Sequence, residues 1–117
     1  MHRFKELRVW ERSIDLAEAV YQTTQTFPVE ERYGLTSQLR RASVSVASNI
    51  AEGAGRNSNK EFAHFLGIAS GSCAELETQL IIATRLDFID GIKLHALQTH
   101  INEVSNMLYR LKDSLRA

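Results

Sequence analysis

Hydrophobic residues recur every three or four positions along most of the chain, the spacing of one face of an α-helix. This spacing predicts four helices, of which the first runs from about Glu6 to Thr26. The first helix has two neighbouring apolar stripes, so its predicted buried face is wider than a coiled-coil seam. One stripe is Leu7, Trp10, Ile14, Ala17 and Tyr21, and the other is Val9, Leu16, Val20 and Phe27. Pro28 ends the helix, because the residue before a proline avoids the α region.

The second helix follows a connector, residues 28–34, which has room for a short helical turn. Thr36 or Ser37 can serve as its N-cap. Its core stripe is Leu35, Leu39, Ala42, Val46 and Ile50. Residues 43–46 alternate like a strand, but helical spacing on both sides favours a helix. The glycines of Gly53-Ala54-Gly55 are expected to end it.

The third helix is predicted to start at a capping box, with Ser58 as N-cap and Glu61 reaching back, and to run to about Leu86. Its core stripe is Phe62, Phe65, Leu66, Ala69, Cys73, Leu76, Leu80 and Ala83. Gly67 and Gly71 lie four residues apart and leave room for a neighbouring helix to approach. Each costs roughly 1 kcal/mol of helix propensity against alanine, which close packing would offset.

The fourth helix has the clearest heptad pattern in the chain. A turn at Asp87–Gly91 precedes it, with Asp90 as N-cap. Its apolar positions are Leu94, Leu97, Ile101, Val104, Leu108, Leu111 and Leu115. Because short connections favour antiparallel neighbours, the sequence predicts an all-α fold, an up-down-up-down antiparallel four-helix bundle forming one domain over residues 1–117.

Composition supports a folded domain and bears on its location. Hydrophobic residues make up 44% of the 117 residues and charged residues 24%, with one proline and six glycines, which argues against disorder and turn-rich β folds. The longest apolar run, Leu80–Ala83, is far shorter than the ~20 residues that span a bilayer. The N-terminal stretch lacks an apolar segment typical of secretion signals, and one cysteine cannot form an internal disulfide. We therefore expect a cytoplasmic protein.

The charges are unevenly distributed, although the formal net charge is zero. Residues 32–60 contain five basic residues and one acidic residue, whereas residues 61–103 contain six acidic and two basic residues. Such segments can neutralise one another within a subunit or between subunits. The alternative is a basic patch that binds RNA, DNA or an acidic partner.

Few residues suggest chemistry. Glu61 and His64 match the Glu-x-x-His element of di-iron bundles, but that site needs a second copy and both residues face away from the core stripe. Cys73 lies on the apolar stripe and is expected to be a buried thiol. His2, His95 and His100 are predicted to be solvated. Phosphate-loop, nucleophile-elbow and Cys-x-x-Cys motifs do not occur, so we expect a non-enzymatic protein without cofactor or metal.

The second half of the second helix is unusually poor in charge, because Glu52 is the only charged residue between Ser43 and Gly55. A monomeric bundle normally presents charged residues on its outer face, so this face predicts contact with another protein surface. The candidate oligomer interface is Arg41, Val44, Ala47, Ser48, Ala51 and Glu52, with Arg41 and Glu52 as candidates for pairing between subunits. Asn49 lies at the edge of the core stripe, where a buried asparagine can fix register.

Two segments, Y-G-L-x-x-Q-L-R-R at 33–41 and N-I-A-E-G at 49–53, resemble the four-helix bundle family of 23S rRNA intervening-sequence, or S23-type, proteins. The resemblance extends by motif over residues 4–90. It implies a cytosolic bundle that assembles into a ring-like homopentamer and has no established enzymatic activity. A related accessory variability protein of diversity-generating retroelements binds nucleic acid through a basic pentamer surface.

Two functional hypotheses follow. The first is a homo-oligomer, by resemblance a pentamer, that acts as a scaffold or partner-binding protein. The second is an RNA-binding accessory protein whose basic patch comes from the second helix and its exit turn. The candidate contacts for nucleic acid are Arg40, Arg41, Arg56 and Lys60, supplemented by Arg3, Lys5, Arg8 and Arg12.

Overall fold

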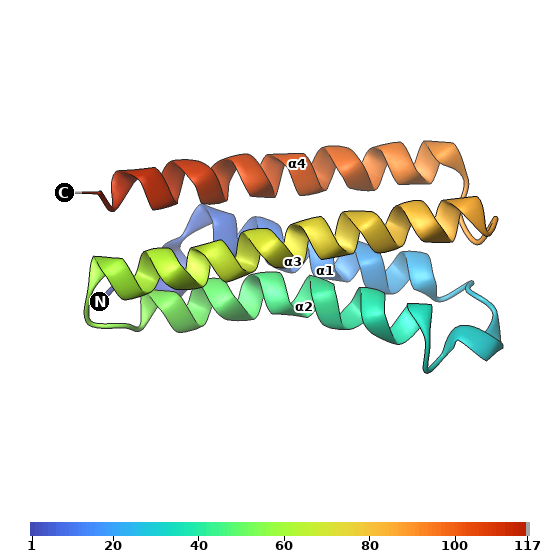
Figure 1. Cartoon of the computed structure of the whole chain (residues 1–117), viewed down its shortest axis with the longest axis horizontal. Coiled ribbons are helices and arrows are strands. Elements are labelled where there is room, and N and C mark those ends of the chain that lie inside the picture. The colour runs from blue at the N-terminus through green and yellow to red at the C-terminus, as the bar shows by residue number, and fades with distance from the viewer. Residues whose placement is uncertain (117) are drawn as a thin grey trace.

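Four long helices lie alongside one another in an antiparallel bundle (Figure 1). The structure is a computed structural model that describes residues 1–116. Its elements are η1 (Phe4–Glu6), α1 (Arg8–Thr24), η2 (Val29–Glu31), α2 (Leu35–Ala54), α3 (Asn59–Arg85) and α4 (Gly91–Ser114). Helix α1 contacts α2 and α4, and α3 contacts the same two helices. The helices therefore surround the core in chain order, which confirms the predicted four-helix bundle.

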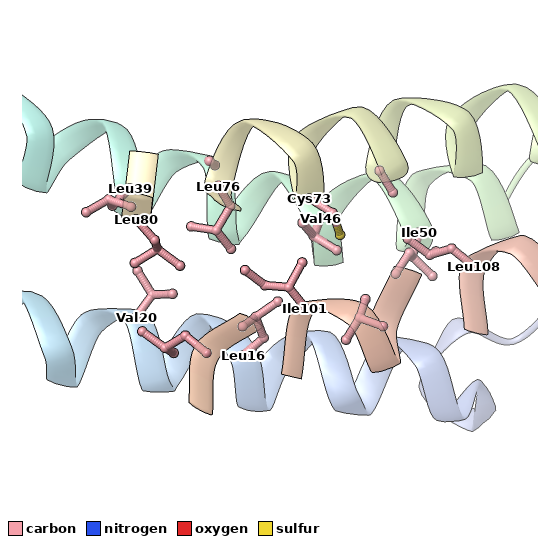
Figure 2. Packing of buried hydrophobic residues seen from close by; sticks show 14 of the residues in the cluster. Leu16, Val20, Leu39, Val46, Ile50, Cys73, Leu76, Leu80, Ile101 and Leu108 are labelled. Carbon is pink, nitrogen blue, oxygen red and sulfur yellow. The ribbon is translucent and has the colours of Figure 1, made fainter. Parts of the chain in front are cut away.

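The core consists of hydrophobic side chains, most of them aliphatic, contributed by all four helices (Figure 2). The largest fully buried residues are Phe62, Leu16, Leu39, Ile50, Leu66, Leu76, Leu80, Ile101, Leu108, Val20, Val46 and Val104. Each such side chain contributes roughly 1.5–3 kcal/mol when it leaves water. The predicted core stripes of the second and fourth helices are confirmed, although the terminal positions Leu94, Leu111 and Leu115 are only partly buried. Among the described residues, no helix has the length and hydropathy needed to cross a bilayer.

The two apolar stripes of α1 are not equally buried. Leu16 and Val20 are fully buried, whereas Ile14 and Tyr21 of the other stripe are 44% and 41% exposed. Only one side of a helix can face the centre of a four-helix bundle, and both stripes have the required spacing. The buried side also includes Ser13, whose hydroxyl donates to the Val9 carbonyl at 2.7 Å. A serine does not belong to the hydrophobic pattern that predicts burial, but this bond satisfies its hydroxyl and so allows Ser13 to be buried.

Two of the three predicted N-caps are confirmed, although no hydrogen bond from the Ser58 N–H to the Glu61 side chain completes the predicted capping box within residues 1–116. The Ser58 hydroxyl accepts a hydrogen bond from the Glu61 N–H at 3.1 Å, and the Asp90 carboxylate accepts one from the Lys93 N–H at 2.7 Å. These bonds satisfy amide groups that the first turn of a helix leaves unpaired.

The predicted cap of α2 by Thr36 or Ser37 is wrong. This helix begins earlier, at Leu35, after an N-cap position held by Gly34. The carboxylate of Glu31 supplies the missing acceptor, because its Oε1 accepts a hydrogen bond from the Leu35 N–H at 3.0 Å. The helical turn η2 carries Glu31 back to this position, four residues before the amide that it binds. A local sequence pattern for capping does not include an acceptor from a preceding turn.

Close helix approach occurs at Gly53, which was not among the predicted glycines, whereas a Cβ on Gly67 would have one neighbour within 4 Å, the Nζ of Lys112 on α4, at 3.4 Å. A Cβ on Gly53 would lie 2.6 Å from the Cβ of Phe65, so α2 and α3 can meet there only without a side chain. In contrast, a Cβ on Gly71 would have no atom within 4 Å. The prediction that Gly71 accommodates a neighbouring helix is therefore wrong within the described part of this subunit. The end of α2 is as predicted, since the helix stops at Ala54 with Gly55 as its C-cap.

Candidate functional site

The outer face of α2 carries most of the residues that the sequence assigned to an oligomer interface. Val44 is 43% exposed, and Arg41, Ser48 and Glu52 are also exposed. Ala51 is half-buried, whereas Ala47 is only 6% exposed and contributes almost no outer surface. Ala47 differs because it lies on the side of α2 that faces α1, about 100° around the helix from the core residue Val46.

The two charged residues of this face have different environments. The Glu52 carboxylate forms an ion pair, at 2.9 Å, with the guanidinium of Arg56, which lies four residues further along the chain. Arg41 makes no side-chain hydrogen bond or ion pair within residues 1–116, and its side chain is exposed. Arg41 therefore remains available for a partner, while pairing of Glu52 between subunits would compete with Arg56.

The half-exposed stripe of α1 extends this charge-poor surface. The guanidinium of Arg40 lies 4.6 Å from the ring centroid of Tyr21, and its Nε donates to the Thr24 hydroxyl at 2.9 Å. These contacts place the Tyr21 side of α1 next to α2. Residues at helical spacing from Tyr21 share that side. We define the α1/α2 strip as Trp10, Ile14, Ala17 and Tyr21 of α1 together with Val44 of α2.

A groove of about 880 Å³ adjoins one end of this strip, where η2 connects α1 to α2. Within the described part of the chain, three arginines line it, Arg32, Arg40 and Arg41, and no acidic residue does. Two tyrosines also line the groove, and one of them, Tyr33, is 89% exposed. The sequence pattern does not indicate that Arg32 and Tyr33 share a surface with the arginines of α2, because both lie in a connector with no helical periodicity.

The four arginine and lysine residues predicted to contact nucleic acid do not form one patch. Arg40 and Arg41 line the groove, whereas Arg56 and Lys60 line a second hollow at the turn between α2 and α3. At ~1.5 Å per residue, Arg40 and Arg56 are separated by about 24 Å along the helix. Arg56 is also held over the Phe65 ring, with its guanidinium carbon 4.7 Å from the centroid.

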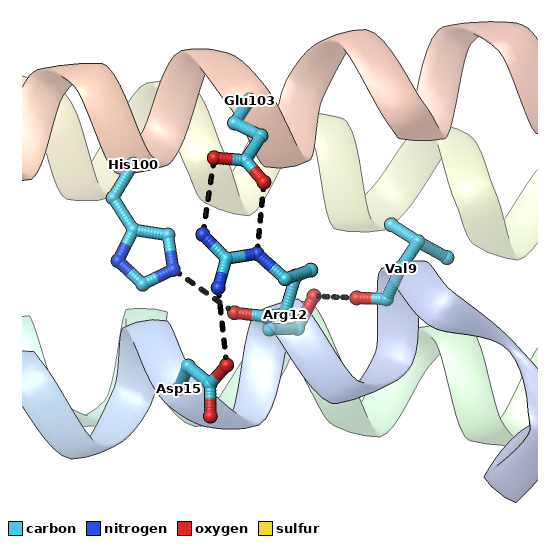
Figure 3. Close-up of polar contacts among 6 residues, drawn as sticks. Val9, Arg12, Asp15, His100 and Glu103 are labelled. Carbon is cyan, nitrogen blue, oxygen red and sulfur yellow. Dashed lines mark hydrogen bonds and ion pairs between the residues drawn. The ribbon is translucent and has the colours of Figure 1, made fainter.

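The supplementary basic residues lie near the N-terminus and also differ in their environments. Arg3 lies 3.6 Å from the carboxylate of Glu6, and both side chains are mostly exposed. Lys5 and Arg8 are exposed as well. Arg12, however, binds across to the last helix, which makes it part of the packing between α1 and α4 (Figure 3).

Arg12 and Glu103 form a bidentate pair between α1 and α4 (Figure 3). The Arg12 Nε donates to Oε1 of Glu103 at 2.8 Å, and Nη2 donates to Oε2 at 3.0 Å. This hydrogen bonding lowers the pKa of Glu103 and raises that of Arg12, while burial acts in the opposite direction on each. His100 is half-buried beside the pair, with Nε2 3.2 Å from the Arg12 carbonyl oxygen. The prediction that His100 is simply solvated is therefore wrong.

Asn49 joins a short polar chain between α2 and α3. Its Nδ2 donates to the carbonyl and the hydroxyl oxygen of Ser45, at 2.8 and 3.0 Å. The Ser45 hydroxyl in turn lies 2.9 Å from that of Ser72 on α3. Because Ser45 and Ser72 must lie at the same height along the two helix axes to make this contact, it favours a single register of α2 and α3.

The candidate metal and thiol residues occupy surface and core positions respectively. Glu61 and His64 are both exposed, and no cluster of three metal-ligating side chains occurs within residues 1–116. Cys73 is only 1% exposed, as predicted, and burial raises the pKa of its thiol, partly opposed by a hydrogen bond with Ser105. His2 and His95 are exposed, and the His2 ring lies 4.9 Å from that of Phe62.

Comparisons with known proteins agree with this architecture. The chain resembles a crystal structure, at 1.70 Å resolution, of a protein of unknown function from the S23 ribosomal protein family of Bacteroides thetaiotaomicron. The TM-score is 0.79 at 20% sequence identity, and the match covers 89% of this chain and 97% of the other. No curated protein matches the chain. The family described as 23S rRNA-intervening sequence protein matches residues 5–110, nearly the whole sequence, and the chain belongs to that family.

Proposed function

We propose that this protein is a non-enzymatic, cytosolic four-helix bundle that works as a homo-oligomer and serves as a scaffold or partner-binding protein. The α1/α2 strip is the observation that carries the proposal. It adds the half-exposed Ile14 and Tyr21 to the outward Val44, three large side chains that a monomer would leave partly in water. Apolar patches on soluble proteins mark interaction sites when they are contiguous. The resemblance to S23-type proteins adds the expectation of five subunits.

The interior of the bundle supports a structural rather than a catalytic role. Hydrophobic side chains, most of them aliphatic, fill it, and the buried hydroxyls of Ser13 and Thr24 donate to carbonyls one turn earlier in their own helix. These hydroxyls are satisfied locally. The surface of the bundle is therefore the part of the molecule that we expect to act.

The oligomer is tested by measuring mass in solution. Sedimentation or mass photometry at micromolar concentration should give a multiple of the 13.2 kDa subunit. Val44→Glu should shift the population towards monomer, because a carboxylate would lose its water at the interface. Ile92→Glu is the matched control, since Ile92 is 84% exposed and belongs to α4, which contributes no residue to the strip. A stable wild-type monomer at this concentration would refute the proposal.

Binding of structured RNA is a second candidate function, favoured by the groove beside η2. Its three arginines could contact phosphates, and the exposed Tyr33 offers a ring on which a base could stack. Both contacts are common in proteins that bind single-stranded regions of RNA. Arg40 is already bound to Tyr21 and Thr24, so Arg32 and Arg41 would supply most of the phosphate contacts.

Salt dependence distinguishes this candidate from simple scaffolding. Affinity for a structured RNA should fall steeply as salt rises, and Arg41→Ala should reduce the slope of log affinity against log salt by about one. Lys93→Ala removes an exposed cation from α4 and should leave the slope unchanged. Absence of RNA binding at low salt would eliminate this candidate and leave the first intact.

A further inference from the structure

Helix α4 lies along one edge of the bundle, and its outer side carries a row of polar residues (Figure 1). Among the long helices, α4 contacts α1 and α3. The row lies about 150° around the helix from the buried residues of α4, so it faces away from the core. Its members recur at spacings of four and three, and all are exposed. We define the α4 stripe as His95, Thr99, Asn102, Asn106, Tyr109 and Asp113.

The α4 stripe is poor in charge for the outer side of a helix. From His95 to Tyr109 it contains no lysine, arginine, aspartate or glutamate. The outer side of α1 shows the more usual composition, since Glu11, Asp15 and Glu18 occupy exposed positions at the same spacing. Asparagine, threonine, histidine and tyrosine are also weaker helix formers than lysine or glutamate. Their use on this side is explained if their amide and hydroxyl groups bind another surface.

The hydrogen-bonding groups of the stripe are largely unused within the subunit. The side chains of Asn102, Asn106 and Tyr109 make no hydrogen bond within residues 1–116, and Tyr109 is 64% exposed. The Thr99 hydroxyl donates to the His95 carbonyl at 3.0 Å, which leaves its oxygen free to accept. The stripe therefore offers both donors and acceptors to a partner.

We propose that the α4 stripe is a docking surface for the α4 stripe of a second copy, with the two helices antiparallel. The spacings of four, three, four, three and four residues read the same from either end. A two-fold contact centred level with Val104 therefore places every stripe position opposite another one. At its centre Asn102 faces Asn106 of the second copy, and an amide facing an amide can both donate and accept.

The outer pairs of this contact are complementary as well. Thr99 faces Tyr109 of the second copy, whose hydroxyl can donate to the free threonine oxygen. His95 faces Asp113, so an imidazole N–H meets a carboxylate. Within the subunit Asp113 has only a 3.8 Å contact with Arg116, and both side chains are mostly exposed. The two-fold axis repeats each pair, and the contact extends over about 27 Å of helix.

Other arrangements of the two helices lose this complementarity. Sliding one helix by two turns places Thr99 opposite Asn102 and leaves Tyr109 and Asp113 without partners. A parallel contact places Asp113 beside Asp113, which brings like charges together. The chemistry of the side chains therefore favours one orientation and one register, as complementary polar groups do at other interfaces.

This contact is separate from the assembly proposed above, because the α1/α2 strip contains no residue of α4. A contact between polar surfaces gains little from burial, so we expect it to be weak between single subunits. Where subunits also assemble through another face, the contact joins two assemblies and is strengthened because several copies engage at once.

Pairwise cross-linking tests the orientation and register. Each protein carries Val44→Glu, which removes the contribution of the α1/α2 strip, and one cysteine in the stripe. Under mild oxidation, Thr99→Cys mixed with Tyr109→Cys should give a covalent dimer of twice the 13.2 kDa subunit mass. The control is Thr99→Cys mixed with Asn102→Cys, whose thiols would lie about 10 Å apart along the axis. We expect the first mixture to cross-link about tenfold faster. The native Cys73 is buried and should not interfere.

Self-association without a cross-link provides an independent measurement. Sedimentation of Val44→Glu should show a mass that rises above 13.2 kDa at submillimolar concentration. Adding Asn102→Lys should abolish the rise, because the two-fold axis brings the two new cations close together. Adding Glu11→Lys, a change of charge on the exposed outer side of α1, should not abolish it. Circular dichroism should show that all variants are folded, since every substituted position except Val44 is fully on the surface.

The outcomes separate this inference from the proposed function. Equal cross-linking rates in the two mixtures, or a Val44→Glu protein that stays monomeric at submillimolar concentration, would refute the α4 contact and leave the assembly intact. Fastest cross-linking of Thr99→Cys with itself would show a parallel contact and also refute the inference. A wild type that is monomeric at micromolar concentration would refute the assembly, whereas the cross-linking result would still decide the α4 contact.

Discussion

The side chains of Arg12 and Glu103 clamp α1 to α4 through two parallel hydrogen bonds, of 2.8 and 3.0 Å. The two residues are 91 positions apart, so the pair connects the first long helix to the last. Its planar, bidentate geometry makes it stronger than a single ion pair, although both side chains remain in contact with water.

Removing this pair should make stability less dependent on pH in the acid range. The lowered pKa of Glu103 means that its carboxylate stabilises the fold fully above the unfolded-state pKa of about 4.3. The stabilisation is lost as pH falls through the lower pKa of the folded state. We therefore expect Glu103→Gln to lower the urea midpoint modestly at pH 7, with the difference from wild type vanishing at pH values below the folded pKa.

Glu18→Gln is the control for this measurement, because Glu18 is an exposed glutamate on α1 outside the ion pairs found within residues 1–116. Its midpoint should follow wild type across the same pH range. High salt should also shrink the effect of Glu103→Gln, since exposed charges are screened. A difference that persists unchanged at low pH would show that Glu103 acts through packing instead.

Gly53 and Gly71 should respond in opposite directions to alanine. Gly53→Ala forces a Cβ to within 2.6 Å of the Phe65 Cβ, so α2 and α3 must move apart, at a cost of about 1–3 kcal/mol. The Cβ of Gly71→Ala would meet no atom of residues 1–116 within 4 Å, and the change should gain about 1 kcal/mol of helix propensity. Urea unfolding in the Val44→Glu background, which is expected to be monomeric, measures both effects without a contribution from assembly. Equal effects would mean that close packing at Gly53 does not matter.

Glu31 should be more important for α2 than the hydroxyls at its start. Glu31→Ala leaves the Leu35 N–H without its 3.0 Å acceptor and should cost about 1 kcal/mol, as other N-cap losses do. Ser37→Ala is the matched control, because Ser37 is exposed and lies within the helix, and should change stability by less than about 0.5 kcal/mol. Thermal unfolding compares the two, and a larger loss for Ser37→Ala would restore the sequence-based cap.

The thiol of Cys73 should react only when the bundle opens. Burial excludes reagents and raises the thiol pKa, which keeps the reactive thiolate scarce at pH 8. A colorimetric disulfide reagent should therefore label native protein slowly and urea-unfolded protein at once. Gly53→Ala should accelerate labelling of the native protein, because it pushes α2 and α3 apart. Ile92→Cys places a thiol at an exposed position, and this thiol should react immediately in the folded protein. Rapid labelling of native wild type would contradict the buried position.

The helices themselves could be predicted from sequence because they depend on local properties. Periodicity located all four, Pro28 and Gly55 marked two of their ends, and Ser58 and Asp90 marked two starts. Each signal acts over a few neighbouring residues, through backbone sterics or a single hydrogen bond. The start of α2 was missed because its acceptor, Glu31, comes from a preceding turn whose conformation the pattern does not encode.

The candidate surfaces were only partly predictable. The outward face of α2 was identified by its lack of charge, yet Ala47 proved to be covered and the α1 contribution was assigned to the core. Arg40, Arg41, Arg56 and Lys60 looked like one basic group in the sequence but occupy two ends of a helix. Proximity along a chain does not give proximity on a surface, because a helix carries residues apart at about 1.5 Å each.

Local patterns along the chain specify four amphipathic helices with short connections, and hence a bundle, because helical spacing of apolar residues leaves few other ways to bury them. The assembled bundle, in contrast, sets which stripe of α1 faces the core, which glycine lies at a helix contact, and how Arg12 meets Glu103. Those features depend on the rotation and height of each helix relative to its neighbours. Packing of all four helices fixes these quantities together, and no local pattern specifies them.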